Sequence, residues 1–109
     1  MRFHFVGIGG AGMSVVAELL HSQGATISGS DAKASAVTAH LEGLGIAVSI
    51  GQAAQNVPRD AVVVVSSAIR DDNPELAAAR AHGQRVLHRS QALALAAEGR
   101  DFVAVAGAH

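Results

Sequence analysis

The feature of this sequence that most constrains its fold is a cluster of glycines between an apolar run and a helical pattern. Residues 2–7 have the composition of a short β-strand and lead into Gly7-Ile8-Gly9-Gly10-Ala11-Gly12, which matches G-x-G-x-x-G. Apolar residues then recur at the spacing of one helical face. These residues are Met13, Val16, Ala17 and Leu20. Strand, glycine loop and helix in this order are typical of the first unit of a doubly wound α/β fold.

Strands and helices are predicted to alternate along the rest of the chain. Further strands are expected over 25–29, 46–50, 61–65, 85–87 and 101–106. Helices are expected with Val37, Leu41 and Leu44 on one face, over 74–80 after an Asn73 cap, and over 92–97 after Ser90. The valine run in 61–65 indicates a central strand buried on both faces. We therefore predict a Rossmann-like, doubly wound parallel sheet of about five strands with helices on both faces, in a single domain.

Composition excludes several classes of function. The chain has 109 residues, 50% of them apolar, which suits one domain with one core. Its net charge of −1 and scattered basic residues argue against a nucleic-acid partner. It contains no cysteine, hence no disulfide or thiolate metal site. Glycines interrupt the N-terminal apolar run before it could form a signal segment or cross a membrane, so we expect a soluble, cytoplasmic protein with no membrane partner.

The glycine loop predicts a diphosphate ligand. Glycines allow a tight turn and a close approach of the ligand to backbone N–H groups at the start of a helix, whose dipole favours negative charge. Asp31 follows the second predicted strand, where its carboxylate can accept hydrogen bonds from the hydroxyls of a ribose. The motif specifies a diphosphate beside a ribose, which both a nicotinamide dinucleotide and a UDP-sugar provide.

Five stretches of the sequence resemble a known family and keep its order and spacing. Together they closely resemble the first domain of the Mur ligase family, in its branch that joins L-alanine to UDP-N-acetylmuramate. The stretches are His4-Phe5-Val6-Gly7-Ile8-Gly9-Gly10-Ala11-Gly12-Met13-Ser14, Ser28-Gly29-Ser30-Asp31, Val63-Val64-Val65-Ser66-Ser67-Ala68-Ile69, Asp72-Asn73-Pro74-Glu75-Leu76 and Val105-Ala106-Gly107-Ala108-His109.

The resemblance implies an ATP-dependent, amide-bond-forming ligase of peptidoglycan biosynthesis with three domains. The first domain would bind UDP-N-acetylmuramate, the second ATP and Mg²⁺, and the third L-alanine. On this basis we expect residues 1–99 to be the UDP-N-acetylmuramate-binding domain. We expect residues 100–109 to begin the first strand and the nucleotide-binding loop of the central ATPase domain. This chain would then hold no catalytic residue, metal site or cofactor, and would be inactive alone.

The resemblance also assigns site residues. The amides around Ile8 to Met13 would hold the pyrophosphate, Ser30 and Asp31 would meet the ribose or uracil, and the segment after the valine run would border the nucleotide. The expected substrate-binding residues are Ile8, Gly9, Gly10, Ala11, Gly12, Met13, Ser30, Asp31, Ser67, Ala68 and Ile69. Two positions depart from the family pattern: Ala108 stands where threonine is usual, and Gln52 where histidine is common.

Other polar groups have structural explanations. Asn73-Pro74-Glu75 is explained by a helix N-terminus, with a cap, a first-turn proline and a favourable acidic charge. Asp71 and Asp72 are adjacent in a loop and do not converge as an acid and a base must. The six histidines, His4 among them, show no metal-binding spacing, and we expect them at the surface or at strand ends.

Three alternative functions are also compatible with the sequence. One is a nicotinamide-dinucleotide-binding domain of a dehydrogenase or sensor, motivated by the glycine motif and the acidic residue after the second strand. Another is the related ligase that attaches a recycled peptide to the same UDP-sugar. The third is a structural module that has lost its ligand.

Overall fold

The chain folds around a five-stranded sheet in which every pairing is parallel. The computed structural model describes the backbone of residues 1–107 and the side chains of residues 1–98. The strands lie in the order β3-β2-β1-β4-β5. Their bounds are β1 Arg2–Val6, β2 Thr26–Asp31, β3 Ala47–Ile50, β4 Val62–Val65 and β5 Val86–His88. The predicted parallel α/β fold is confirmed, except that β1 is the central strand and the valine run β4 lies beside it, between β1 and β5.

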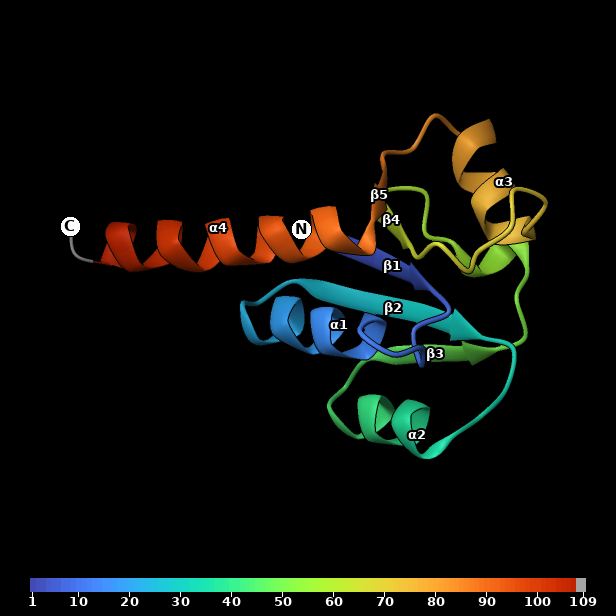
Figure 1. Cartoon of the computed structure of the whole chain (residues 1–109), viewed down its shortest axis with the longest axis horizontal. Coiled ribbons are helices and arrows are strands. Elements are labelled where there is room, and N and C mark those ends of the chain that lie inside the picture. The colour runs from blue at the N-terminus through green and yellow to red at the C-terminus, as the bar shows by residue number, and fades with distance from the viewer. Residues whose placement is uncertain (108–109) are drawn as a thin grey trace.

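Helices cover both faces of the sheet (Figure 1). Their bounds are α1 Met13–Ser22, α2 Ala36–Gly43, the 3₁₀ turn η1 Ala54–Asn56, α3 Pro74–Ala81 and α4 Arg89–Gly107. Residues of α1, α2 and α4 belong to one hydrophobic cluster, whereas Ala79 of α3 packs with Val57, Val63 and Val6 in a second. The helix after β1 and the helix after β4 therefore lie on opposite faces, which places a topological switch between these two strands.

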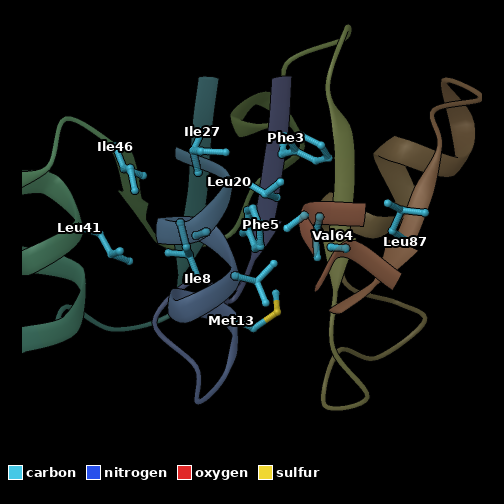
Figure 2. Packing of buried hydrophobic residues seen from close by; sticks show 14 residues of the cluster. Phe3, Phe5, Ile8, Met13, Leu20, Ile27, Leu41, Ile46, Val64 and Leu87 are labelled. Atoms are coloured by element: carbon cyan, nitrogen blue, oxygen red, sulfur yellow. The ribbon is translucent and has the colours of Figure 1, made fainter. Parts of the chain in front are cut away.

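The alternation of side chains along β1 explains the two clusters. Phe3 and Phe5 are fully buried in the first cluster, and Figure 2 shows them beside Leu20 of α1. Val6 belongs to the second cluster, and His4 points toward α3, where it contacts Glu75. Because successive side chains of a strand point to opposite faces, a single strand joins both halves of the core.

The first helix agrees with the sequence prediction, and the second differs in part. The buried residues of α1 are Met13, Val16, Ala17 and Leu20, as its periodicity predicted. In α2, Leu41 is fully buried, but Val37 is 38% exposed, and Leu44, the residue directly after the helix, is 40% exposed. The reason is position: α2 lies beside the edge strand β3, where only a narrow stripe of the helix meets the core.

The last predicted strand is wrong. We expected a helix over 92–97 capped by Ser90 and a strand over 101–106, but α4 begins at Arg89 and continues to Gly107. A strand needs a neighbour for its backbone hydrogen bonds, and no described strand lies beside this segment. A helix satisfies these groups within the segment itself. Ala108 and His109, expected in a nucleotide-binding loop, lie outside the described residues.

Candidate functional site

The glycine loop connects the central strand to α1 at the carboxyl edge of the sheet. Gly7 and Gly12 have φ of 79° and 80°, a region that side-chain-bearing residues rarely adopt. The N–H groups of Gly7 and Ile8 donate to the Ser30 carbonyl at 2.9 and 2.8 Å. These two bonds attach the loop to the end of β2, so that the two parts of the predicted motif are held together.

Most of the N–H groups predicted to receive a pyrophosphate already have acceptors within the protein. Ile8 donates to the Ser30 carbonyl, Gly10 to the Gly7 carbonyl at 3.0 Å, and Met13 to the Gly10 carbonyl at 3.1 Å. Gly9 donates to a carboxylate oxygen of Asp31 at 2.9 Å. Among the described residues, no acceptor receives the N–H of Ala11 or Gly12. The donors open to an anion are therefore concentrated at the start of α1.

Asp31 lies beside the glycine loop, as predicted from the ends of adjacent strands. Its Oδ2 accepts from Gly9, and its Oδ1 accepts from the Lys33 N–H at 3.3 Å. A β-carbon on Gly9 would lie 2.9 Å from Asp31 Oδ2 and 3.2 Å from Thr38 Cγ2. The second glycine of the motif is thus required for the close approach of this carboxylate. The carboxylate is half-buried and retains unused acceptor positions for a ligand hydroxyl.

Ser30 does not face the open edge of the site. It is fully buried, and its hydroxyl donates to Glu75 Oε1 at 2.7 Å. Its carbonyl accepts the two loop N–H groups described above. In this structure Ser30 therefore supports the glycine loop and the end of β2, while Asp31 presents the polar group next to the loop.

A buried carboxylate beneath the site joins four segments of the chain. Glu75 Oε1 accepts from His4 Nε2 at 2.6 Å as well as from Ser30. Its Oε2 accepts from the Ala53 N–H at 3.1 Å and from Asn56 Nδ2 at 3.0 Å. Burial alone would raise the pKa of Glu75, but hydrogen bonds from His4, Asn56 and Ser30 and the electrostatic attraction of the imidazole lower it below its ordinary value.

Sequence reasoning missed this network. We explained Glu75 by the helix dipole alone and assigned His4 to the surface or a strand end, but both side chains are buried, at 0% and 1% exposure. The one sequence signal was that His4 lies between Phe3 and Phe5 in a predicted strand, where a polar side chain needs a partner if it is buried. The identity of that partner, 71 residues along the chain, could not be read from spacing.

The segment after β4 meets the glycine loop from the other side of the topological switch. Ser67 and Ala68 are exposed. Ile69 packs against Gly7, since a β-carbon there would be 3.5 Å from Ile69 Cδ1. Ser67 Oγ also lies 3.1 Å from His88 Nε2 at the end of β5. The structure thus brings all three residues to the same edge as the loop, in the crevice where open α/β sheets bind ligands.

Gln52 and the acidic loop lie toward α3. Asn73 caps α3 by accepting from the Glu75 N–H at 2.9 Å, and its amide donates to Gln52 Oε1 at 2.7 Å. The residue that departs from the family pattern is therefore tied to the helix cap. Asp71 and Asp72 are 93% and 82% exposed and form loose surface pairs with arginines. Both aspartates are therefore solvated loop charges that do not act as an acid and a base, as predicted.

The start of α4 contributes a residue that was not predicted. Arg89 follows β5 directly and lies against Gly12, together with which it lines a hollow of about 270 Å³. Its neighbours there include Val15, Ser90 and Leu93. No residue described by the structure forms an ion pair with Arg89. A signal for it existed in the sequence, because the residue after a parallel strand lies at the ligand-binding edge.

The fold and site define a Rossmann-like α/β domain with a glycine loop and an acidic residue at a topological switch. A family model described as "Mur ligase family, catalytic domain" matches residues 2–101. The chain therefore belongs to the Mur ligase family.

Comparison with individual proteins gives the same family. The chain is 58% identical over 106 residues to a UDP-N-acetylmuramate–L-alanine ligase of Bifidobacterium longum subsp. infantis, covering 97% of this chain and 21% of that protein. It is 55% identical over 109 residues to the enzyme of that name from Streptomyces coelicolor, covering 99% and 24%. The chain thus spans about a fifth to a quarter of the length of these curated relatives.

Solved structures of related ligases share the fold. A UDP-N-acetylmuramate-alanine ligase from Thermotoga maritima superposes with a TM-score of 0.80 at 40% identity, over 84% of this chain and 21% of that one. A murein peptide ligase from Psychrobacter arcticus gives 0.76 at 29% identity, over 85% and 20%.

Proposed function

We propose that this chain anchors the nucleotide end of UDP-N-acetylmuramate in a ligase that adds L-alanine to that substrate. The observation that carries the proposal is the pairing of the glycine loop with Asp31, through the 2.9 Å bond between Gly9 and the carboxylate, in a chain of this family. The diphosphate would lie at the start of α1, and Asp31 would accept from the ribose hydroxyls.

The predicted site residues would have different roles, according to whether their polar groups are free or already bonded within the protein. Ala11 and Gly12 would donate their N–H groups to the diphosphate, while Ile8, Gly9, Gly10 and Met13 would shape the loop through their internal bonds. Ser30 would support Asp31 from below. Ser67, Ala68 and Ile69 would border the nucleoside across the switch. This division follows from which polar groups already have partners.

The whole protein's chemistry is proposed from its relatives. It would be an ATP-dependent, amide-bond-forming enzyme of cytoplasmic peptidoglycan synthesis, with residues 1–99 as the UDP-N-acetylmuramate-binding domain and 100–109 leading into the ATPase domain. Among the described residues, no group of three or more His, Asp or Glu side chains could hold a metal ion. ATP and Mg²⁺ would be bound by the other domains of the whole protein. No helix in the described part of the chain has the length and hydropathy to cross a membrane.

The test is calorimetric titration of the folded chain with UDP-N-acetylmuramate, UDP and NADH under identical conditions. We expect both uridine ligands to bind and NADH to give little heat, because the site is proposed for a UDP-sugar. Preference for NADH would instead support a nicotinamide-binding domain. No saturable binding of any of the three by folded protein would overturn the proposal.

A further inference from the structure

The guanidinium of Arg89 occupies a specific place beside the glycine loop. α4 packs against α1, which brings its first residue back over the start of α1. A β-carbon on Gly12 would lie 3.2 Å from Arg89 Cδ and 3.3 Å from Cζ, with Nη1 closer still. The last glycine of the motif therefore makes room for an arginine from another part of the chain, and no side chain separates the guanidinium from the loop backbone.

Arg89 has donors without acceptors at this position. The side chain is half-buried. Within the described part of the chain it makes neither a side-chain hydrogen bond nor an ion pair; the ion pairs there involve Arg2, Arg70 and Arg80 and two histidines. A guanidinium carries five N–H donors in a planar fork that suits phosphate oxygens. An anion at this place would receive a charge-assisted, two-pronged contact.

The donors without acceptors lie close together at Gly12, and the charges around the loop differ from one end to the other. The N–H groups of Ala11 and Gly12 have no acceptor among the described residues, and Arg89 lies over Gly12. At the other part of the loop, Gly9 is bonded to the Asp31 carboxylate. Negative charge therefore lies on the β2 side of the loop, and positive charge on the α4 side. A nucleoside diphosphate fits this polarity with its ribose toward Asp31 and its phosphates toward Arg89.

We propose that Arg89 binds the diphosphate of the nucleotide ligand, together with the N–H groups of Ala11 and Gly12, and so makes the site selective for diphosphate over monophosphate. This inference rests on the proposed function, because it concerns the same ligand. It adds a residue outside the glycine motif and assigns the direction in which the ligand lies across the loop.

The experiment measures the Kd of UDP and UMP for the wild-type chain and for Arg89→Ala, Arg89→Lys and Arg85→Ala. Arg85→Ala is the control because it removes the same charge as Arg89→Ala. Arg85 is exposed and lies just before β5, at the amino-terminal ends of the strands, whereas Arg89 lies at their carboxyl ends. We expect Arg89→Ala to weaken UDP binding about 10- to 100-fold, the range of a charged hydrogen bond, and UMP binding much less. Arg89→Lys should fall between, and Arg85→Ala should resemble wild type.

The outcomes distinguish the two proposals. Equal losses for UDP and UMP in Arg89→Ala and Arg89→Lys, or no loss in either, would overturn the role of Arg89 while leaving uridine-nucleotide binding intact. No binding of UDP by the wild-type chain would overturn this inference, and the proposed function would fall as well if UDP-N-acetylmuramate also failed to bind. The inference would be established if the preference for UDP over UMP, given by the ratio of their Kd values, declines in the order wild type, Arg89→Lys, Arg89→Ala. Far-UV circular dichroism verifies that each variant is folded.

Discussion

Removing the buried Glu75 carboxylate should destabilise the protein strongly. In Glu75→Ala, His4 and Ser30 lose their acceptor while fully buried, which costs roughly 1–3 kcal/mol each. Ala53 and Asn56 are only partly buried and can turn to water. We therefore expect a loss of about 3–5 kcal/mol in the free energy of unfolding at pH 7, as when one partner of a buried pair is removed.

Glu75→Gln should be much milder, for a geometric reason. The backbone N–H of Ala53 and the amide N–H of Asn56 can only donate, so the glutamine oxygen must face them. Its NH₂ then faces His4 and Ser30, which can both accept after a shift of the imidazole proton and a rotation of the hydroxyl. Only the charge-assisted part of the bonds is lost, and we expect a cost of about 1–2 kcal/mol.

The pH dependence follows from the lowered pKa of Glu75. A carboxyl group whose folded pKa lies below its ordinary value of 4.5 contributes stability that is complete above that value. The contribution is lost as the pH falls through the folded pKa. Glutamine does not titrate, so the difference in stability between wild type and Glu75→Gln should narrow as the pH falls below 4.5.

The assay is urea unfolding followed by far-UV circular dichroism, since the chain has no Trp or Tyr. Glu42→Gln is the control, because Glu42 is exposed on α2 and its loss should change neither stability nor pH dependence. A Glu75→Ala variant within about 0.5 kcal/mol of wild type would refute the reasoning, since that is the usual range for surface changes. So would a Glu75→Gln variant less stable than Glu75→Ala.

Three further predictions concern the parts around the site. Gly29→Ala would place a β-carbon 2.5 Å from Ile8 Cδ1 and 2.7 Å from Ile8 Cβ. Overpacking should cost about 1–3 kcal/mol in urea unfolding, whereas Gly43→Ala, which meets nothing within 4 Å, should not destabilise; equal stabilities would contradict this. Asp31→Ala should weaken UDP binding by roughly 1–3 kcal/mol in calorimetry, and unchanged affinity would exclude its contact with the ribose. Asn73→Ala should lower the free energy of unfolding by about 1 kcal/mol through loss of the α3 cap, and Asn73→Ser should recover it. An Asn73→Ala variant as stable as wild type would show that the cap does not stabilise the protein.

Local patterns in the sequence determined the elements and the edge of the sheet that holds the site. The buried face of α1 follows from its 3.6-residue period, and the start of α3 follows from an asparagine cap before a proline. Asp31 could be placed beside the glycine loop because the carboxyl ends of adjacent parallel strands meet at one edge. Each of these inferences depends on residues close in sequence or on a general rule of parallel sheets.

Only the tertiary structure decided how the polar groups pair. The bond between His4 and Glu75 spans 71 residues, and it turned a helix-terminal glutamate into a buried acceptor that also holds Ser30 away from the open edge. Arg89 reaches Gly12 only because α4 packs on α1. Tertiary structure also decided the conformation of residues 101–106, which the sequence pattern predicted as a strand. These residues continue helix α4, and no described strand lies beside them. Periodicity specifies which face of an element is buried, but not which side chain from a distant segment it meets there.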